Sequence, residues 1–554
     1  MWFDELYSVW VASGDFPNEI LQRLWEDDSH APLYHFILHF YMKFFGNSFI
    51  GFHVFNLIIT MFAFPVAYFL GREVAGGKNN ENSHKFALFS VLLLAFNYFH
   101  IAFSQETRFY NLAGILLTIS TLFLFKQINN GFKKHYLIGV FAPNIIMCYT
   151  LTPGCLYVFI QALVFGLYFL FNKRELIKPL VISSFVTLLL YLPYIPFVYH
   201  QFWVSSNSFM GSYAHAKIDT LYIMEIFYNW FAHTPMVYVQ LKDFLDLSLD
   251  YNRARLLLFF TQIALLTMFL VKSLTLKDKL KKLLFAFLMA LCAFHLVFLI
   301  FHLAPFMPRY CIAFMPFFAI CFASALLELQ NKMVKIIIIS FLIVPGIFAY
   351  FFIPHKTCFM QYGRFGPGVE VLRAYNLTPE DRVFKTHSAK LLAPIGIQAT
   401  PVDVCLNATF LFYNPRRLEM IFGDDYLKYE TREQKNDYID DYMFDSKINE
   451  HNKSYYNKQI NSMEKGARIA LWLSTPDSDY ITFAKEYSNL EGISREDKRL
   501  LIRDFTPRRE VYRYVNFKVE EDYRRLALDD KRLRAVDGTP LVGTSIMLFE
   551  KVRD

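Results

Sequence analysis

The chain has 554 residues and a formal net charge of +7, and 55% of its residues are hydrophobic, among them 61 Phe. Its mean hydropathy is +0.26, and this apolar content exceeds what the cores of soluble domains need. The composition therefore excludes a purely soluble protein and indicates a membrane protein. Much of the positive charge lies in short loops between apolar stretches, and no nucleic-acid-binding motif is present, so we expect no nucleic-acid partner.

We expect residues 1–50 to form a first extracytoplasmic loop with interfacial helices. After this loop, roughly ten mostly apolar stretches of about 17 to 22 residues follow, and a helix of that length crosses a bilayer. The stretches are Phe52–Gly71, Phe86–Phe103, Leu112–Lys126, Tyr136–Leu151, Gly154–Phe171, Pro179–Tyr199, Ala254–Val271, Leu283–Phe301, Tyr310–Leu327 and Ile336–Ile353.

Positive charge alternates along the connecting loops. The basic loops contain Arg72, Lys78 and Lys85, then Lys126, Lys133 and Lys134, then Lys173, Arg174 and Lys178, then Lys272, Lys277, Lys279, Lys281 and Lys282, then Lys332 and Lys335. The positive-inside rule places these loops in the cytoplasm. The loops His100–Asn111, His200–Arg253 and His302–Arg309 then lie outside, and all six Trp residues fall on that outer side, as interfacial aromatic residues do.

An even number of spans places both termini outside, and a bacterial inner membrane is the expected location. A chain that starts outside needs a signal peptide or a preceding span, and neither is present before Met1. We therefore expect one further helix upstream that this sequence lacks.

The apolar stretches end at Pro354, which divides the chain into a transmembrane catalytic domain (1–354) and an extracytoplasmic soluble α/β domain (355–554). In the second domain we expect strands at Arg382–Thr386, Ala467–Leu473, Glu510–Phe517 and Ser545–Lys551, and helices at Ser494–Asp504 and Val519–Leu533. Cys358 and Cys405 are the one pair for which a disulfide is worth considering, because the other cysteines lie in apolar segments.

Acidic residues mark the first outer segment. Asp4 and Glu5 lie in the sequence WFDELY, and a carboxylate at an interface can accept the proton of an attacking nucleophile. The alternative is that Asp4 caps a helix over Leu6–Val11. The same segment continues with DDSHAPLY, which contains Asp27, Asp28, His30 and Pro32.

A second cluster, FSQETRFYN, lies at the outer end of an apolar span, where Glu106 and Arg108 are costly unless they are paired or used. Arg108 is the candidate anion-binding residue, because a guanidinium binds two phosphate oxygens at once. An ion pair between Glu106 and Arg108 is the alternative, but residues two apart on a helix do not face each other. Glu106 and Tyr110 are four apart and could share a face, so Glu106 could orient Tyr110 or bind a cation.

The third cluster, HLAPFMPRYCIAFMP, contains His302, Arg309 and Tyr310 where one span exits and the next enters. Arg309 is a candidate for binding a lipid phosphate, and interfacial snorkelling is its alternative explanation. His302 could be a metal ligand, although an interfacial histidine with ordinary hydrogen bonds is the more common case.

At these residues the chain resembles the GT-C glycosyltransferases, in the branch that contains protein O-mannosyltransferases and the lipid A aminoarabinose transferase. Four motifs match in order. They are the acidic pair Asp4 and Glu5, the HPPLYY-like His30–Gly46 segment, the SQExRxY-like Ser104–Tyr110 segment and the RYxxPxxP-like Arg309–Pro316 segment. The chain departs from the pattern at Ala31, where Pro is usual, and after Pro354.

The resemblance implies an α-helical polytopic membrane protein of the GT-C type that transfers a sugar, with inversion, from a polyprenyl-phosphate donor to a lipid, polysaccharide or protein acceptor. It implies that Asp4, with Glu5, activates the acceptor. Arg108, Arg309 and Tyr310 would bind the donor phosphate, while His30, Glu106 and Tyr110 would line the substrate pocket. A divalent metal is one option as cofactor, with Glu106 and His302 as its candidate ligands.

Two other functions fit a polytopic chain. A transporter is one, but transporters concentrate polar residues, broken helices and repeats near the membrane midplane, whereas here the ionisable residues lie at the outer ends of the spans. A non-catalytic membrane scaffold is the other. The sequence leaves the sugar and the acceptor open.

Overall fold

The computed structural model describes residues 3–27, 30–77, 82–104, 106–206, 264–300, 308–340, 371–372, 374–378, 380–385, 399–401, 450–474, 522–541 and 544–553. The chain forms two compact units. The helical unit contains Val11–Val204 and Ala214–Phe359. The sheet unit contains Met1–Trp10, Ser205–Tyr213 and Met360–Asp554, so the first ten residues group with the C-terminal part of the chain.

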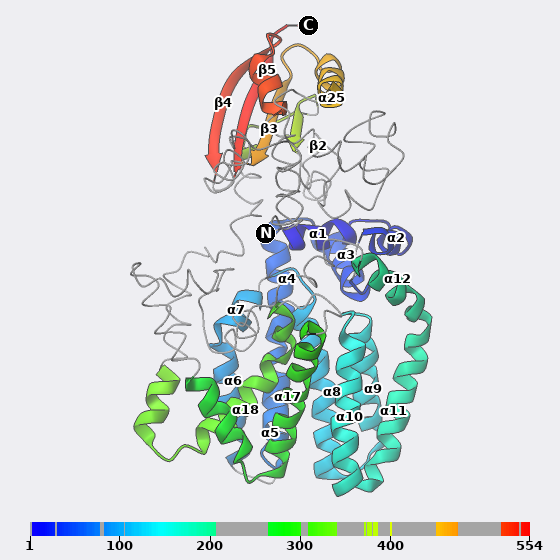
Figure 1. Cartoon of the computed structure of the whole chain (residues 1–554), viewed down its shortest axis with the longest axis vertical. Helices are drawn as coiled ribbons and strands as arrows, with labels where there is room; N and C mark the ends of the chain where they lie inside the picture. Colours follow the sequence, from blue (N-terminus) through cyan, green and yellow to red (C-terminus); the bar gives the residue numbers. More distant parts are fainter. Residues whose placement is uncertain are drawn as a thin grey trace, which may run out of the picture. The chain divides into compact units, whose positions relative to one another are not determined.

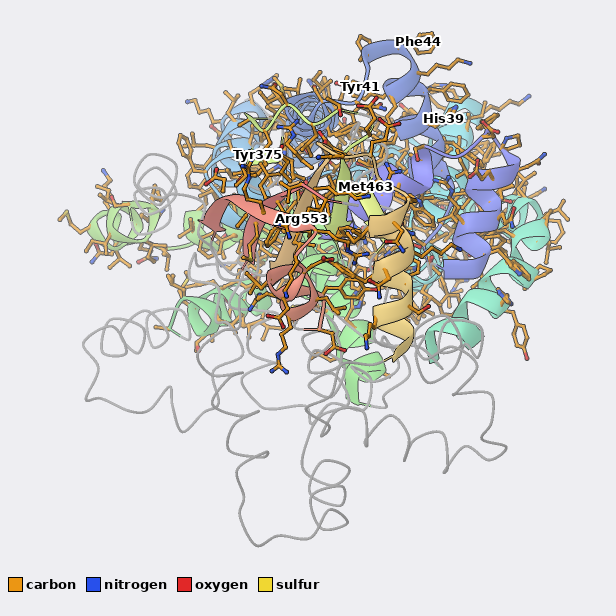
Figure 2. All side chains as sticks on the ribbon, turned by 90° about the horizontal axis from the view of Figure 1, so that it is seen from above. His39, Tyr41, Phe44, Tyr375, Met463 and Arg553 are labelled. Carbon is orange, nitrogen blue, oxygen red and sulfur yellow. The ribbon has the colours of Figure 1, made fainter. Side chains whose placement is uncertain are left out.

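Three short helices come first, as Figure 1 shows: α1 (Phe3–Ala12), α2 (Asn18–Asp27) and α3 (Leu33–Phe45). Helix α3 is amphipathic. It buries Tyr34 and Leu38, four residues apart on one face, whereas Phe44 at its end is 75% exposed. Figure 2 shows His39, Tyr41 and Phe44 along this helix. A helix with an exposed aromatic end suits an interfacial position, which is what the sequence predicts for this segment.

Helices of different lengths follow α3 and make up most of the helical unit (Figure 1). They are α4 (Phe49–Met61), α5 (Ala63–Val74), α6 (Asn82–Ala95), α7 (Tyr98–Ser104), α8 (Tyr110–Asn130), α9 (Lys134–Cys148), α10 (Gly154–Asn172), η2 (Arg174–Leu176), α11 (Ile177–Tyr191), η3 (Leu192–Tyr194), α12 (Ile195–Ser206), Ala264–Leu274, α17 (Lys279–Ile300), η4 (Pro308–Phe314), α18 (Met315–Leu327) and 332–340. Helix α8 is central among them, because it packs against α5, α9 and η4.

The described part of the chain contains six helical stretches that are long and apolar enough to cross a membrane. They are Ile50–Val74, Tyr110–Asn130, Gly154–Asn172, Arg174–His200, Lys279–Val297 and Tyr310–Leu327. Each coincides with a stretch predicted from hydropathy. The six together make this a helical membrane protein.

Two predicted spans differ from the helices that form. Phe86–Phe103 was expected to be continuous, but the chain leaves the helix at Phe96 and Asn97 and divides it into α6 and α7. The Asn97 side chain accepts a hydrogen bond from the backbone N–H of His100 at 3.1 Å, which caps α7 and explains the break. The second, Tyr136–Leu151, forms only the 15-residue α9, which contains Pro143.

The sheet unit contains a five-stranded mixed sheet of order β2-β1-β3-β5-β4. Strands β1 and β2, and β1 and β3, pair in parallel, whereas β3 with β5 and β4 with β5 pair antiparallel. The strands are β1 (Arg382–Lys385), β2 (Ala399–Pro401), β3 (Arg468–Ser474), β4 (Leu533–Leu541) and β5 (Thr544–Lys551), with α25 (Glu450–Asn461) and a helix at 522–529. Helices on a mixed sheet make this part α/β.

Three of the predicted strands coincide with β1, β3 and β5. The predicted helix Val519–Leu533 is too long, because the helix ends at 529 and Leu533 begins β4. The charged residues 529–532 before β4 continue the helical pattern, but pairing with β5 begins at Leu533, opposite Lys551. The predicted elements Glu510–Phe517 and Ser494–Asp504, and the cysteines at 358 and 405, lie outside the described residues.

An ion pair fixes the start of two neighbouring strands in the sheet unit. Arg468 of β3 contacts Asp381, just before β1, with 2.9 Å between Nη2 and Oδ2. The backbone N–H groups of Arg468 and Thr378 also donate to the Asp381 carboxylate, at 2.6 and 2.7 Å. Burial alone would raise the pKa of Asp381, but these hydrogen bonds and the guanidinium outweigh it and hold the pKa below its ordinary value.

Candidate active site

The turn between α7 and α8 carries the second predicted cluster. Residues 106–108 form a bend in which the Arg108 N–H donates to the Glu106 carbonyl at 2.7 Å, and α8 begins only at Tyr110. The expectation that Glu106 and Tyr110 share a helical face is therefore wrong. The helical spacing argument against a Glu106–Arg108 contact also does not apply, because these residues are not in a helix. Both side chains are buried, with Glu106 4% and Arg108 2% exposed.

Side chains from two other helices hold this turn in place. Helix α7 ends at Ser104, so its last carbonyl groups lack partners within the helix. The Phe103 carbonyl accepts from Asn111 of α8 at 2.8 Å. The Ser104 carbonyl accepts from the Asn56 amide and the Thr60 hydroxyl of α4, both at 3.3 Å. These contacts satisfy the carbonyl groups at the end of α7, so the helix can end at Ser104 and the buried turn can follow.

His30 and Arg108, 78 residues apart in the sequence, lie in direct contact. The guanidinium Nη2 is 3.1 Å from Nε2 of His30. A guanidinium only donates hydrogen bonds, so Nε2 is the acceptor and the proton of the neutral imidazole is on Nδ1. The Phe109 ring packs against both, 4.8 Å from the His30 ring centroid and 4.9 Å from Cζ of Arg108. The structure thus joins the first and second predicted clusters.

The third cluster joins them through aromatic contact. The rings of Tyr110 and Tyr310 meet edge to face with centroids 5.6 Å apart, and Cζ of Arg108 lies 5.8 Å from the Tyr110 ring. Helix α8 and η4 approach closely at this point, because a Cβ atom on Gly114 would lie 2.9 Å from the Cα of Ala313. Within the described residues, the buried Tyr110 hydroxyl has no hydrogen-bond partner.

The acidic residues of the first segment lie in another unit. Asp4 is the second residue of α1, so the alternative in which it caps a helix starting at Leu6 is wrong. Glu5 is 2% exposed. Both belong to the sheet unit, whereas His30, Arg108 and Tyr310 belong to the helical unit.

Several predicted site residues fall outside what the structure describes. They are the side chains of Asp4, Asp27 and Arg309, and the residues Asp28 and His302. Within the described ranges, no three His, Cys, Asp or Glu side chains gather as metal ligands would. The predicted metal ligand pair of Glu106 and His302 stays a prediction.

The sequence reasoning missed the residues that support the site. Asn56, Thr60 and Gly114 were counted only as members of apolar spans, and Asn111 only as the end of an outer loop. An available signal was the pair Asn56 and Thr60, because two polar residues four apart share one face of an otherwise apolar helix.

The sequence matches no family model and no curated protein, but the fold has known counterparts. The chain is similar to ArnT from Cupriavidus metallidurans, a GT-C glycosyltransferase and lipid A aminoarabinose transferase. Compared with the crystal structure of ArnT bound to undecaprenyl phosphate, the TM-score is 0.50 at 10% identity, over 99% of this chain and 93% of that chain. This chain has the fold of ArnT.

A second crystal structure of ArnT from the same organism, in the apo state, gives a TM-score of 0.49 at 10% identity, over 87% of this chain and 89% of that chain. The resemblance inferred from the four motifs is thus confirmed for the fold by the structure with bound undecaprenyl phosphate.

Proposed function

We propose that this protein is a glycosyltransferase that moves a sugar from a polyprenyl-phosphate-linked donor to an acceptor at the extracytoplasmic membrane face, with inversion. The observation that carries the proposal is the convergence of His30, Arg108, Tyr110 and Tyr310 within a GT-C-type fold. These residues come from three segments that are far apart in the sequence. Their meeting around one buried guanidinium is typical of an anion site.

Arg108 is the residue that we assign to the donor phosphate. Its side chain is 2% exposed, and a charge at such a position interacts with a phosphate more strongly than it would in water. The hydrogen bond to the neutral His30 aligns the guanidinium without cancelling its charge. An incoming phosphate can then accept two N–H groups from the planar fork, and a lysine could not reproduce this geometry.

The neighbouring residues shape the remainder of the site. We assign Tyr310 and Arg309 of η4 to the phosphate together with Arg108. His30, Glu106 and Tyr110 are assigned to the pocket around the sugar, where hydroxyl, imidazole and carboxylate groups can hydrogen-bond to sugar hydroxyls. A divalent metal held by Glu106 would add charge stabilisation for the departing phosphate.

Asp4 is assigned as the general base and Glu5 as its acidic partner. In an inverting transfer, the acceptor attacks the anomeric carbon from the side opposite the phosphate, and the base accepts the acceptor's proton as the new bond forms. Polyprenyl phosphate is a good leaving group, so positioning and charge stabilisation outweigh acid catalysis. The supporting ArnT structure contains undecaprenyl phosphate, the lipid expected as the product here.

The test is transfer of radiolabelled hexose or pentose from undecaprenyl phosphate to membrane acceptors by the purified chain. Asp4→Asn should lower the rate by roughly 10² to 10⁴, and Arg108→Ala should abolish transfer and weaken undecaprenyl phosphate binding. Arg174→Ala, at an exposed arginine of the same unit, is the matched control and should behave as wild type. Normal transfer by both site variants at normal folding would refute the assignment and favour a transporter or scaffold.

A further inference from the structure

We propose that Asn56 is a positioning residue, which sets the place of Arg108 by joining the first outer segment to the turn that carries Arg108. The inference rests on the proposed function, because it assigns Asn56 a role in binding the donor phosphate. Asn56 lies on α4 and is 1% exposed. A buried amide in an apolar helix is costly unless its donor and acceptor are both used.

Both ends of the Asn56 amide have a partner, and the partners belong to different segments. The Nδ2 group donates to the Ser104 carbonyl at 3.3 Å, and the Tyr34 hydroxyl of α3 donates to Oδ1 at 3.4 Å. This assignment of the amide is required, since a backbone carbonyl can only accept. Asn56 therefore bridges α3 and the end of α7.

The bridge and the His30–Arg108 contact form two hydrogen-bonded connections between the same two segments. Tyr34 lies four residues after His30, and Ser104 lies four residues before Arg108. The outer connection is the 3.1 Å bond between His30 and Arg108. The inner connection runs from Tyr34 through Asn56 to Ser104. Removal of the inner connection leaves the His30–Arg108 bond and the contacts of the Phe109 ring with the His30 and Tyr34 rings, at 4.8 and 6.1 Å, which orient the guanidinium less strictly than a second hydrogen-bonded connection does.

Thr60 contacts the same Ser104 carbonyl as Asn56 does, and Thr187 serves as its control. Its one hydroxyl proton is shared between the Asn56 carbonyl one turn earlier, at 2.9 Å, and the Ser104 carbonyl, at 3.3 Å. Thr187 of α11 makes the first kind of contact alone, to the Ser183 carbonyl at 2.9 Å. Both threonines are buried, with Thr60 1% and Thr187 4% exposed. Thr60→Val and Thr187→Val thus differ in the contact to Ser104.

Loss of the Asn56 bridge is expected to weaken binding of the donor and to leave binding of the acceptor unchanged. A shift of the turn moves the guanidinium fork relative to the phosphate, and misplacement by about 1 Å costs up to roughly 10²-fold in rate. We therefore expect Asn56→Leu to raise the donor KM and the Kd for undecaprenyl phosphate by roughly 10- to 100-fold. Thr60→Val should raise both by about two- to tenfold, as the loss of one hydrogen bond does. The acceptor KM should stay unchanged in both variants.

The experiment measures these constants for wild type, Asn56→Leu, Thr60→Val and Thr187→Val in detergent, together with the double variant Asn56→Leu/Arg108→Ala. If Asn56 acts through Arg108, the double variant binds undecaprenyl phosphate no more weakly than Arg108→Ala alone. A further loss in the double variant, or equal changes in Thr60→Val and Thr187→Val, would overturn the inference.

Two results separate this inference from the proposed function. A wild-type chain that neither transfers sugar nor binds undecaprenyl phosphate would refute the proposed function, and the inference with it. If the wild-type chain does both, and Asn56→Leu and Thr60→Val give the same KM and Kd values as wild type, the positioning role alone is refuted. If Asn56→Leu does not fold, the comparison of Thr60→Val with Thr187→Val decides the question.

Discussion

Replacement of Gly114 by alanine adds one methyl group where α8 and η4 are closest. The new Cβ would lie 2.9 Å from the Cα and 3.0 Å from the carbonyl oxygen of Ala313, whereas ordinary van der Waals contact begins at 3.4 Å. Both neighbours are backbone atoms, so no flexible side chain can rotate away. The two elements must separate by at least the difference, about 0.5 Å.

This separation acts directly on the candidate site. Tyr110 lies one helical turn before Gly114, and Tyr310 lies three residues before Ala313, so the edge-to-face contact of the two rings is adjacent to the inserted methyl group. We expect the rate of sugar transfer per unit of folded protein to fall roughly tenfold, since displacement by 1 Å costs up to about 10²-fold. Overpacking should also lower stability by about 1 to 3 kcal/mol.

Gly166→Ala is the matched control for this prediction. Gly166 also lies within an apolar span, in α10, but among the described residues a Cβ there would meet only Leu180 Cδ2, at an ordinary 3.5 Å. Transfer is measured with the labelled donor, and folding is measured by thermal denaturation in detergent. Equal transfer by Gly114→Ala and Gly166→Ala would refute the reasoning that close approach of α8 and η4 aligns the site.

Two further predictions concern stability. Because the folded-state pKa of Asp381 is depressed, its ion pair with Arg468 stabilises the sheet unit above the unfolded carboxyl pKa of about 4, and this contribution is lost as the pH falls below that value. Asp381→Asn should flatten the acid limb of a fluorescence unfolding profile between pH 6 and 2.5, and an unchanged slope would contradict the assignment. Gln161→Leu should lower the thermal stability by about 1 to 2 kcal/mol, because it removes from the membrane-spanning α10 the partner, at 3.0 Å, of the Asn144 amide of α9. Transfer by the folded fraction should not change, and a loss of transfer without a loss of stability would place Gln161 in the site instead.

Local patterns were sufficient where a single segment decides its own structure. Apolar length alone identified Tyr110–Asn130 and Gly154–Asn172, because any helix of that composition is driven out of water whatever its neighbours are. Short apolar runs identified β3 and β5 in the same way. The chemical types in the candidate site were also predictable, since an arginine at the end of an apolar span is costly unless it has a use.

Predictions failed where a few polar atoms override a long apolar pattern. The break at Asn97 depends on one side chain that caps α7, and hydropathy averaged over a window does not register it. The prediction that Glu106 and Tyr110 share a helical face was wrong for a similar reason. Asn56, Thr60 and Asn111 hold the end of α7, and their contacts join residues up to 48 apart.

Composition and apolar length are enough to establish a helical membrane protein with ionisable residues at the ends of its spans, because burial of apolar area depends on these two properties. Which of those residues meet depends on the tertiary structure. His30 reaches Arg108 across 78 residues, and Tyr110 reaches Tyr310 because Gly114 admits the backbone of η4. Such contacts depend on interatomic distances between segments, and these are set by the packing of the whole helical unit.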